Sequence, residues 1–274
     1  MTATWLAPPD EIIHLSGISW QTYETLLREL SDRRLRLTYN RGNLEIMAPS
    51  PEHERFKKVT GRFVETIAEE LDIRIEPLGS TTFKYPELSG AEPDECFYFR
   101  NIDRVRGKKR LDLNEDPAPD LVIEIDVTRS SPNRLRVYAD LGVAEIWIYN
   151  GVSLVIKQLQ NSSYITSQTS QFFPNLPIPE IPRFLQQAET IDYLELVRTF
   201  RSWVRSQISG KSLIFSDKQY CCTSYFSSIY SKTLADLPFL LLFYGQLIPR
   251  WLELAHQQNS LVKVAQSQRE ILLW

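Results

Sequence analysis

Two acidic segments carry the residues best suited to chemistry, EPD at 92–94 and PDLVIEIDVT at 119–128. Side chains alternate between the two faces of a strand. In the second segment one face is therefore apolar, while the other collects the carboxylates of Asp120, Glu124 and Asp126. Either this acidic face meets water and has no chemical role, or it meets a cation.

A pair of carboxylates on neighbouring strands is a suitable site for a hard divalent cation. Mg²⁺ takes oxygen ligands, typically one or two carboxylates with carbonyls, water and substrate phosphate. Asp94 stands where one predicted strand begins, and Glu124 lies in the other. A metal held there polarises a phosphoryl oxygen and lowers the pKa of a bound water, and a nearby cation offsets developing charge. Such a site is suited to phosphodiester hydrolysis, and a solvated strand that merely carries acids is the alternative.

The rest of the sequence supplies elements that could position this pair. Hydrophobic periodicity and turn residues predict helices at 19–30, 50–71, 133–142 and 186–207. The same signals predict hairpins at 35–49 and 144–159, and strands at 73–77, 81–85, 92–101 and 118–128. Ser19 and Ser50 suit helix N-caps, and Asn150-Gly151 is a strong hairpin turn. This order predicts an α/β fold with a mixed β-sheet flanked by helices.

The amino-acid sequences of these segments resemble those of a known family. EPD ending in Asp94, then PDLVIEID and NRLRVYADLGVAEIWIYNG, are similar to the Uma-two family of the PD-(D/E)XK nuclease superfamily, over about residues 10–205. The resemblance implies a restriction-endonuclease-like sheet and metal-dependent hydrolysis of DNA. It implies Asp94 and Glu124 as ligands of Mg²⁺ or Mn²⁺, with the carbonyl of Ile125 as a further ligand.

The third position of the motif departs from the superfamily pattern. Asp126 stands where that pattern has a lysine, and family members often place a lysine four residues before a tyrosine on the following helix. Arg134 occupies that place here, ahead of Tyr138. Arginine stays protonated and clamps phosphate through two nitrogens, but it is a poor base. The resemblance thus implies a catalytic role for Arg134 as a transition-state clamp and for Asp126 as an additional ligand.

Nucleic-acid contacts have two weaker candidates. The segment RNIDRVRGKKR at 100–110 is basic, and we expect phosphate contacts from Arg104, Arg106, Lys108 and Lys109. His53 stands at the start of a predicted helix, where N–H groups bind anions, and the family has a histidine near this point. The alternatives are a solvated hairpin tip and a capping histidine.

Composition limits the function classes. The chain has 274 residues, 43% hydrophobic and 24% charged, with a net charge of −3, so positive charge for DNA must be concentrated locally. Cys96 and the adjacent pair Cys221 and Cys222 form neither a disulfide framework nor a CxxC site, which predicts a reducing, cytoplasmic setting. The apolar run from Leu237 contains Pro238, Pro249 and Arg250, so we predict no membrane helix.

The sequence divides into an endonuclease-like domain at 1–208 and an extension at 209–274. The extension is poor in charge at its start, and helical and poorly ordered states both fit it. Enzymes of this superfamily frequently work as dimers, so a homodimer is one expectation from the resemblance.

Two other functions compete with the nuclease. One is a nuclease fold that has lost its lysine and only binds nucleic acid or a protein partner. The other is a glycosidase-like hydrolase using Asp94 and Glu124, against which the basic segment argues.

Overall fold

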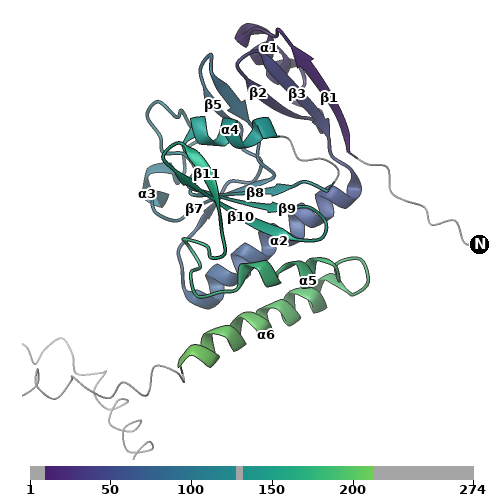
Figure 1. Ribbon diagram of the computed structural model, residues 1–274, viewed down its shortest axis with the longest axis vertical. Coiled ribbons are helices and arrows are strands. Elements are labelled where there is room, and N and C mark those ends of the chain that lie inside the picture. Colours follow the sequence, from purple (N-terminus) through teal and green to yellow (C-terminus); the bar gives the residue numbers. More distant parts are fainter. Residues whose placement is uncertain (1–9, 128–131, 213–274) are drawn as a thin grey trace, which may run out of the picture. The chain divides into compact units, whose positions relative to one another are not determined.

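A computed structural model describes residues 10–127 and 132–212, which form two β-sheets and the helices around them (Figure 1). The smaller sheet has strand order β1-β3-β2-β6-β5, with every pair antiparallel. Its strands are β1 (Glu11–Ser16), β2 (Arg36–Asn40), β3 (Asn43–Ala48), β5 (Phe83–Tyr85) and β6 (Ser89–Ala91). Helix α1 (Trp20–Glu29) lies between β1 and β2 in the chain.

The larger sheet is mixed and has strand order β11-β10-β9-β8-β7-β4. Only β8 and β9 are parallel, and the other neighbours are antiparallel. Its strands are β4 (Glu76–Pro77), β7 (Glu95–Tyr98), β8 (Leu121–Ile125), β9 (Glu145–Tyr149), β10 (Leu154–Gln160) and β11 (Ser163–Ser167). The predicted mixed α/β class is confirmed, although the strands divide between two sheets.

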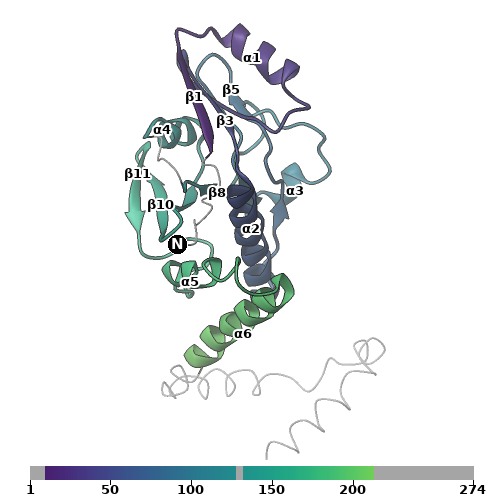
Figure 2. The same ribbon diagram turned by 90° about the vertical axis from the view of Figure 1, so that its right-hand side faces the viewer.

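Helices cover both faces of the larger sheet. Helix α2 (Pro51–Leu71) contacts β8 and α6 (Tyr193–Ser212) on one side, while α4 (Pro132–Leu141) contacts β11 and three strands of the smaller sheet. Figures 1 and 2 show α4 and α2 on opposite sides of β8. The smaller sheet therefore approaches the larger one through α4.

The central strand β8 shows the predicted alternation but has no wet face. Leu121, Ile123 and Ile125 join the apolar core that includes side chains of α2 and α6. Val122 faces the other way and packs with Val137 and other residues of α4. Because α4 covers the second face, Glu124 is enclosed by protein, and the interpretation of a solvated acidic face is wrong.

The smaller sheet also has two different faces. Its apolar face packs against α1 through a cluster of buried residues, namely Trp20, Tyr23, Leu37, Tyr39 and Leu44. The register pairs His14 and Thr38 with Glu45, so these polar side chains share the opposite face with Arg36. This polar face supplies two of the side chains at the site described below.

Most predicted helix starts and turns are confirmed. The Ser19 hydroxyl accepts the N–H of Thr22, and the Ser50 hydroxyl accepts the N–H of His53, as N-caps do. The hairpin between β2 and β3 turns at Arg41-Gly42, both of which have positive φ.

Several predicted boundaries are wrong. The helix predicted at 186–207 starts later, as α6 at Tyr193, because the Asp192 carboxylate accepts the N–H groups of Leu194 and Glu195 at the helix start. A short helix that was not predicted, α5 (Pro182–Leu185), precedes it. Strands β1 and β11 were not predicted, since both are edge strands with exposed side chains and a weak apolar pattern. The basic segment contains a short helix, α3 (Ile102–Val105).

No helix in the described part of the chain is both long and apolar enough to cross a bilayer. Helix α6 continues past the predicted domain boundary at residue 208 and ends at Ser212. The remainder of the predicted extension at 209–274 lies outside the described residues.

Candidate functional site

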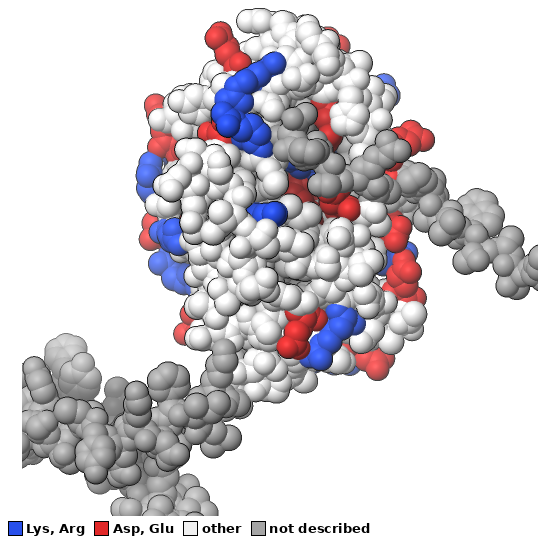
Figure 3. All heavy atoms as spheres, viewed as in Figure 1, with Lys and Arg blue, Asp and Glu red and all other residues white. Residues whose placement is uncertain are grey.

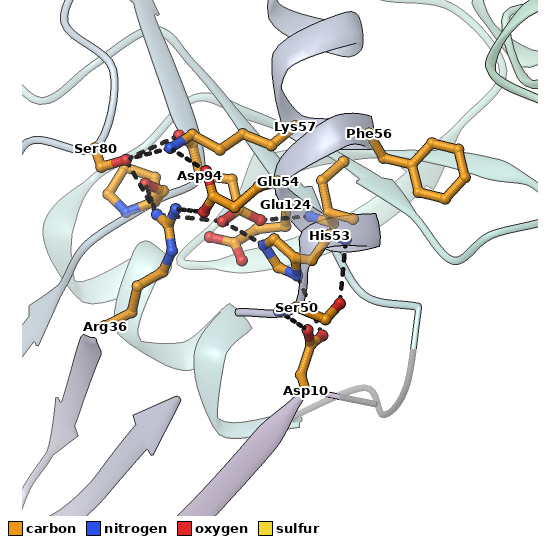
Figure 4. Close-up of polar contacts among 12 residues, drawn as sticks. Asp10, Arg36, Ser50, His53, Glu54, Phe56, Lys57, Ser80, Asp94 and Glu124 are labelled. Carbon is orange, nitrogen blue, oxygen red and sulfur yellow. Dashed lines mark hydrogen bonds and ion pairs between the residues drawn. The ribbon is translucent and has the colours of Figure 1, made fainter. Parts of the chain in front are cut away.

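Asp94 and Glu124 lie side by side on the α4 face of the larger sheet. Strands β7 and β8 pair Glu95 with Ile123 and Cys96 with Val122, so the next position in this register sets Asp94 opposite Glu124. Directly opposed side chains of an antiparallel pair are close neighbours. Both are buried, with exposed fractions of 1% and 5%. The structure thus brings together the two carboxylates that the sequence pattern pairs (Figure 4).

Three donors converge on the Asp94 carboxylate. The N–H of Ile125 donates to Oδ2 at 2.7 Å, while His53 Nε2 and Arg36 Nη1 lie 2.8 and 3.2 Å from Oδ1. Burial alone would raise the pKa of Asp94, but the hydrogen bond from His53 and the charges of Arg36 and His53 outweigh burial and lower it. Asp94 is therefore held ionised and fixed in orientation.

His53 is enclosed between two carboxylates. Its Nδ1 lies 3.2 Å from Asp10 Oδ2, and Asp10 also accepts the N–H of Ser50 at the start of α2. Burial lowers the pKa of the imidazole, but the hydrogen bonds with Asp10 and Asp94 prevail and raise it to about 9. A fully buried imidazolium cannot contact a nucleic acid. In this structure His53 supports Asp94 instead.

Arg36 ties the smaller sheet to the start of β7. Its Nη1 donates to the Pro93 carbonyl at 2.9 Å and to the Ser80 hydroxyl at 3.1 Å, and Nη2 donates to Glu54 at 3.0 Å. Lys57 donates to the same Ser80 hydroxyl at 3.1 Å. Cations from β2 and α2 therefore gather on the Asp94 side of the pair.

Glu124 has different partners, and both come from α4. Tyr138 donates its hydroxyl to Oε1, and Arg134 Nη1 donates to Oε2 at 2.6 Å. Arg134 and Tyr138 are four residues apart, so they share a face of the helix. Burial raises the pKa of Glu124 to about 7, with a contribution from the charge of Asp94, against the opposing charge of Arg134.

Arg134 also reaches the smaller sheet, where Nη2 donates to Glu45 Oε1. Glu45 belongs to β3 and is itself buried. A single guanidinium thus bridges one carboxylate from each sheet.

Asp126 follows the last residue of β8. Its N–H donates to the Tyr149 carbonyl at 2.7 Å, but the strand ladder ends at Ile125. Strand alternation therefore no longer fixes the direction of the Asp126 side chain, and its role as an additional ligand stays a prediction.

Two basic side chains of the segment at 100–110 are paired with acids, and a third donates to a backbone carbonyl. Arg106 pairs with Glu76 at 3.1 Å, Lys108 pairs with Asp116, and Arg104 on α3 donates to the Glu115 carbonyl. Lys109 is exposed. On the face seen in Figure 3, basic and acidic side chains are interspersed in small groups. Phosphate contacts from this segment stay a prediction, with Lys109 as its best-placed residue.

The carboxylate pair fits a divalent cation by the chemistry of its donors. A carboxylate offers about four lone-pair positions. Toward the described residues Asp94 uses three of them and Glu124 uses two, so both retain acceptor capacity there. No cluster of three or more metal-ligating side chains occurs among residues 10–127 and 132–212, but Mg²⁺ needs only one or two carboxylates.

Comparison with known families decides the assignment. The Uma2 model, described as "Putative restriction endonuclease", matches residues 20–192. The chain belongs to the Uma2 family. The resemblance seen in the sequence is thereby confirmed, and this Uma2 assignment supports a nuclease function in general terms.

Solved structures include one similar to this Uma2 chain, described as a putative nuclease belonging to DUF820 from Anabaena variabilis ATCC 29413. It is 13% identical, covers 61% of this chain and 90% of its own, and has a TM-score of 0.36. Comparison with curated proteins finds no match.

Sequence reasoning missed several residues at the Uma2 site, and they share one origin. They come from segments distant in the chain from both acidic motifs, and they are Asp10, Arg36, Glu45, Lys57 and Ser80. One signal was available for two of them, because Arg36 and Glu45 are charged residues inside predicted hairpin strands.

Proposed function

We propose that the chain is a metal-dependent endonuclease that hydrolyses phosphodiester bonds of DNA. The observation that carries the proposal is the pair of buried carboxylates, Asp94 directly before β7 and Glu124 opposite it on β8. Together with the Ile125 carbonyl they would hold Mg²⁺ or Mn²⁺. When bound, such a cation polarises a phosphoryl oxygen and lowers the pKa of water.

The protein's own contribution begins with Asp94. His53 and Arg36 keep its carboxylate ionised, so the ligand is ready at neutral pH. The Ile125 N–H orients the same carboxylate from the neighbouring strand. Two cations and one amide therefore fix Asp94 before any substrate arrives, which limits the reorganisation needed on binding.

Arg134 is the proposed clamp for charge that develops on the phosphate. Its guanidinium stays protonated at any physiological pH, so it acts by charge and hydrogen bonding and not as a base. Its position beside Glu124 puts this charge at the carboxylate pair. Asp126 is retained as a proposed additional ligand, and Lys109 as a proposed phosphate contact.

Plasmid nicking in Mg²⁺ or Mn²⁺ tests the proposal. We expect Asp94→Asn and Glu124→Gln to reduce nicking by about 10²-fold or more, the range for groups that act on a transition state. Glu195→Gln is the matched control, because Glu195 is an exposed acid on α6 away from the pair. Equal nicking by all four proteins would refute the proposal.

A DNA-binding module without cleavage is the second candidate, favoured by the engagement of Arg134 with both Glu124 and Glu45. It predicts DNA binding that weakens steeply with salt and no nicking under any metal. Binding measured over a salt series, alongside the nicking assay, separates the two.

A further inference from the structure

The bridge formed by Glu45, Arg134 and Glu124 places a cation where the proposed metal would bind. Arg134 Nη1 lies 2.6 Å from Glu124 Oε2, and its other terminal nitrogen donates to Glu45. The side chains are all largely buried, with exposed fractions of 11% for Arg134, 6% for Glu124 and 8% for Glu45. In a site of low dielectric, a guanidinium in this position both occupies the carboxylate and repels a second cation.

The arginine has an unused donor. Arg134 Nε is buried and has no hydrogen-bond partner within the described residues. A buried donor without a partner is unfavourable, so this arrangement leaves Arg134 short of one acceptor. A phosphate oxygen is an acceptor of the geometry that a guanidinium edge recognises, since Nε and a terminal nitrogen can bind it together.

The bridge also has space on the Glu45 side. Glu45 lines a cavity of about 220 Å³ together with His14, Thr38 and Asn40 on the polar face of the smaller sheet. His14 Nδ1 lies 3.8 Å from the second oxygen of Glu45, and this histidine is exposed. The Glu45 end of the bridge therefore borders open space.

We propose that Arg134 is a resident counter-ion, which a divalent cation must displace from Glu124, and which then turns its freed N–H groups to the substrate phosphate. Glu45 is the positioning residue that keeps the other end of the guanidinium in place during this exchange. The inference rests on the proposed function, because it concerns the same carboxylate pair. Its consequence is that metal and phosphate favour each other's binding, since the cation frees the arginine that holds the anion.

Mn²⁺ binding, followed by the electron paramagnetic resonance signal of free Mn²⁺ without DNA, tests the exchange. We expect Arg134→Gln to lower the Kd for Mn²⁺ by about tenfold, because the competing charge is gone. Arg134→Lys keeps the charge but cannot bridge two carboxylates. Its Kd for Mn²⁺ should therefore lie between those of the wild type and Arg134→Gln. Asp94→Asn should weaken binding, which shows that the measured site is the carboxylate pair.

The double variant Glu45→Gln/Arg134→Gln guards against a folding defect. It removes one charge of each sign, so its net charge equals that of the wild type, and circular dichroism melting checks that it is folded. We expect it to bind Mn²⁺ as tightly as Arg134→Gln does. If Arg134 had only a structural role, its removal would instead weaken Mn²⁺ binding.

The outcomes separate the two proposals. If wild type binds Mn²⁺ and nicks DNA but neither Arg134→Gln nor the double variant binds more tightly, the exchange is refuted and the nuclease stands. If no variant binds Mn²⁺, both are refuted. Tighter binding by the two variants, with weaker nicking, supports both.

Discussion

The two carboxylates of the site face each other across neighbouring strands, and yet their surroundings shift their pKa values in opposite directions. Asp94 has a lowered pKa, because His53 and Arg36 outweigh its burial. Glu124 has a pKa raised to about 7, because burial outweighs the single arginine beside it. Equal burial thus has different results according to how many cationic donors each carboxylate receives.

The two carboxylates also differ in where their hydrogen-bond partners come from. Asp94 belongs to a fixed network that runs from Asp10 through His53 and is closed by the Ile125 amide. Glu124 has partners that come from one helix, α4, and one of them also serves Glu45. The contacts of Asp94 therefore form a fixed network, whereas the contact between Glu124 and Arg134 is the one that the proposed exchange breaks.

The largest expected effect comes from replacing each acid by its amide. Three donors converge on Asp94, so an amide at this position turns its NH₂ toward at least one of them. Breaking a buried pair in this way costs about 3–5 kcal/mol of unfolding free energy. Among the described residues Glu124 receives two donors, one of them a hydroxyl that can also accept, so Gln fits and should cost about 1 kcal/mol or less.

Urea unfolding at pH 7 in EDTA measures both Asp94→Asn and Glu124→Gln against the wild type. Equal losses of stability in the two variants would remove the contrast between the fixed side and the exchangeable side. A larger loss in Glu124→Gln would reverse it.

An effect of intermediate size is expected in the pH dependence of stability, to which Glu124 and Asp94 contribute with opposite sign. The pKa of Glu124 is about 7 in the folded protein and 4.5 in an unperturbed glutamate. Between these pH values the folded state binds more protons than the unfolded chain, so the contribution of Glu124 falls as pH rises. His53, with a pKa raised to about 9 from 6.5, contributes fully below pH 6.5 and loses its contribution as pH rises toward 9.

Asp94 has the opposite sign. Its lowered pKa means that its contribution is present above pH 3.8 and is lost as pH falls through the folded value. Unfolding of wild type and Glu124→Gln from pH 4 to 9 in EDTA therefore separates the groups. The variant should lack the decline between pH 4.5 and 7 but keep the His53 decline above pH 6.5. Parallel curves over the lower window would contradict the assignment to Glu124.

The sequence predicted those features of the site that depend on neighbouring residues, but not those that depend on contacts between distant segments. Local alternation predicted that Glu124 lies on the face of its strand opposite the apolar residues, and the family resemblance singled out Arg134 ahead of Tyr138. The network around Asp94 could not be predicted this way, because Arg36 reaches Asp94, and Asp10 reaches His53, only once two sheets and a helix start have assembled. The same limit applies to the basic segment, where Glu76 and Asp116 neutralise charges that the sequence shows as a cluster.

The smallest expected effect on the pH dependence comes from the second donor to Glu124, the Tyr138 hydroxyl. Tyr138→Phe removes one hydroxyl that donates to Oε1 and leaves the Arg134 contact on Oε2 in place. Loss of a hydrogen bond to a buried carboxylate costs about 1–2 kcal/mol. Because that hydrogen bond lowers the pKa of Glu124, its removal should raise the pKa further. In the pH series the decline that starts near pH 4.5 should therefore extend to a higher pH than in the wild type. A shift to lower pH would mean that the hydroxyl stabilises the protonated acid, and that Arg134 alone accounts for the charged form.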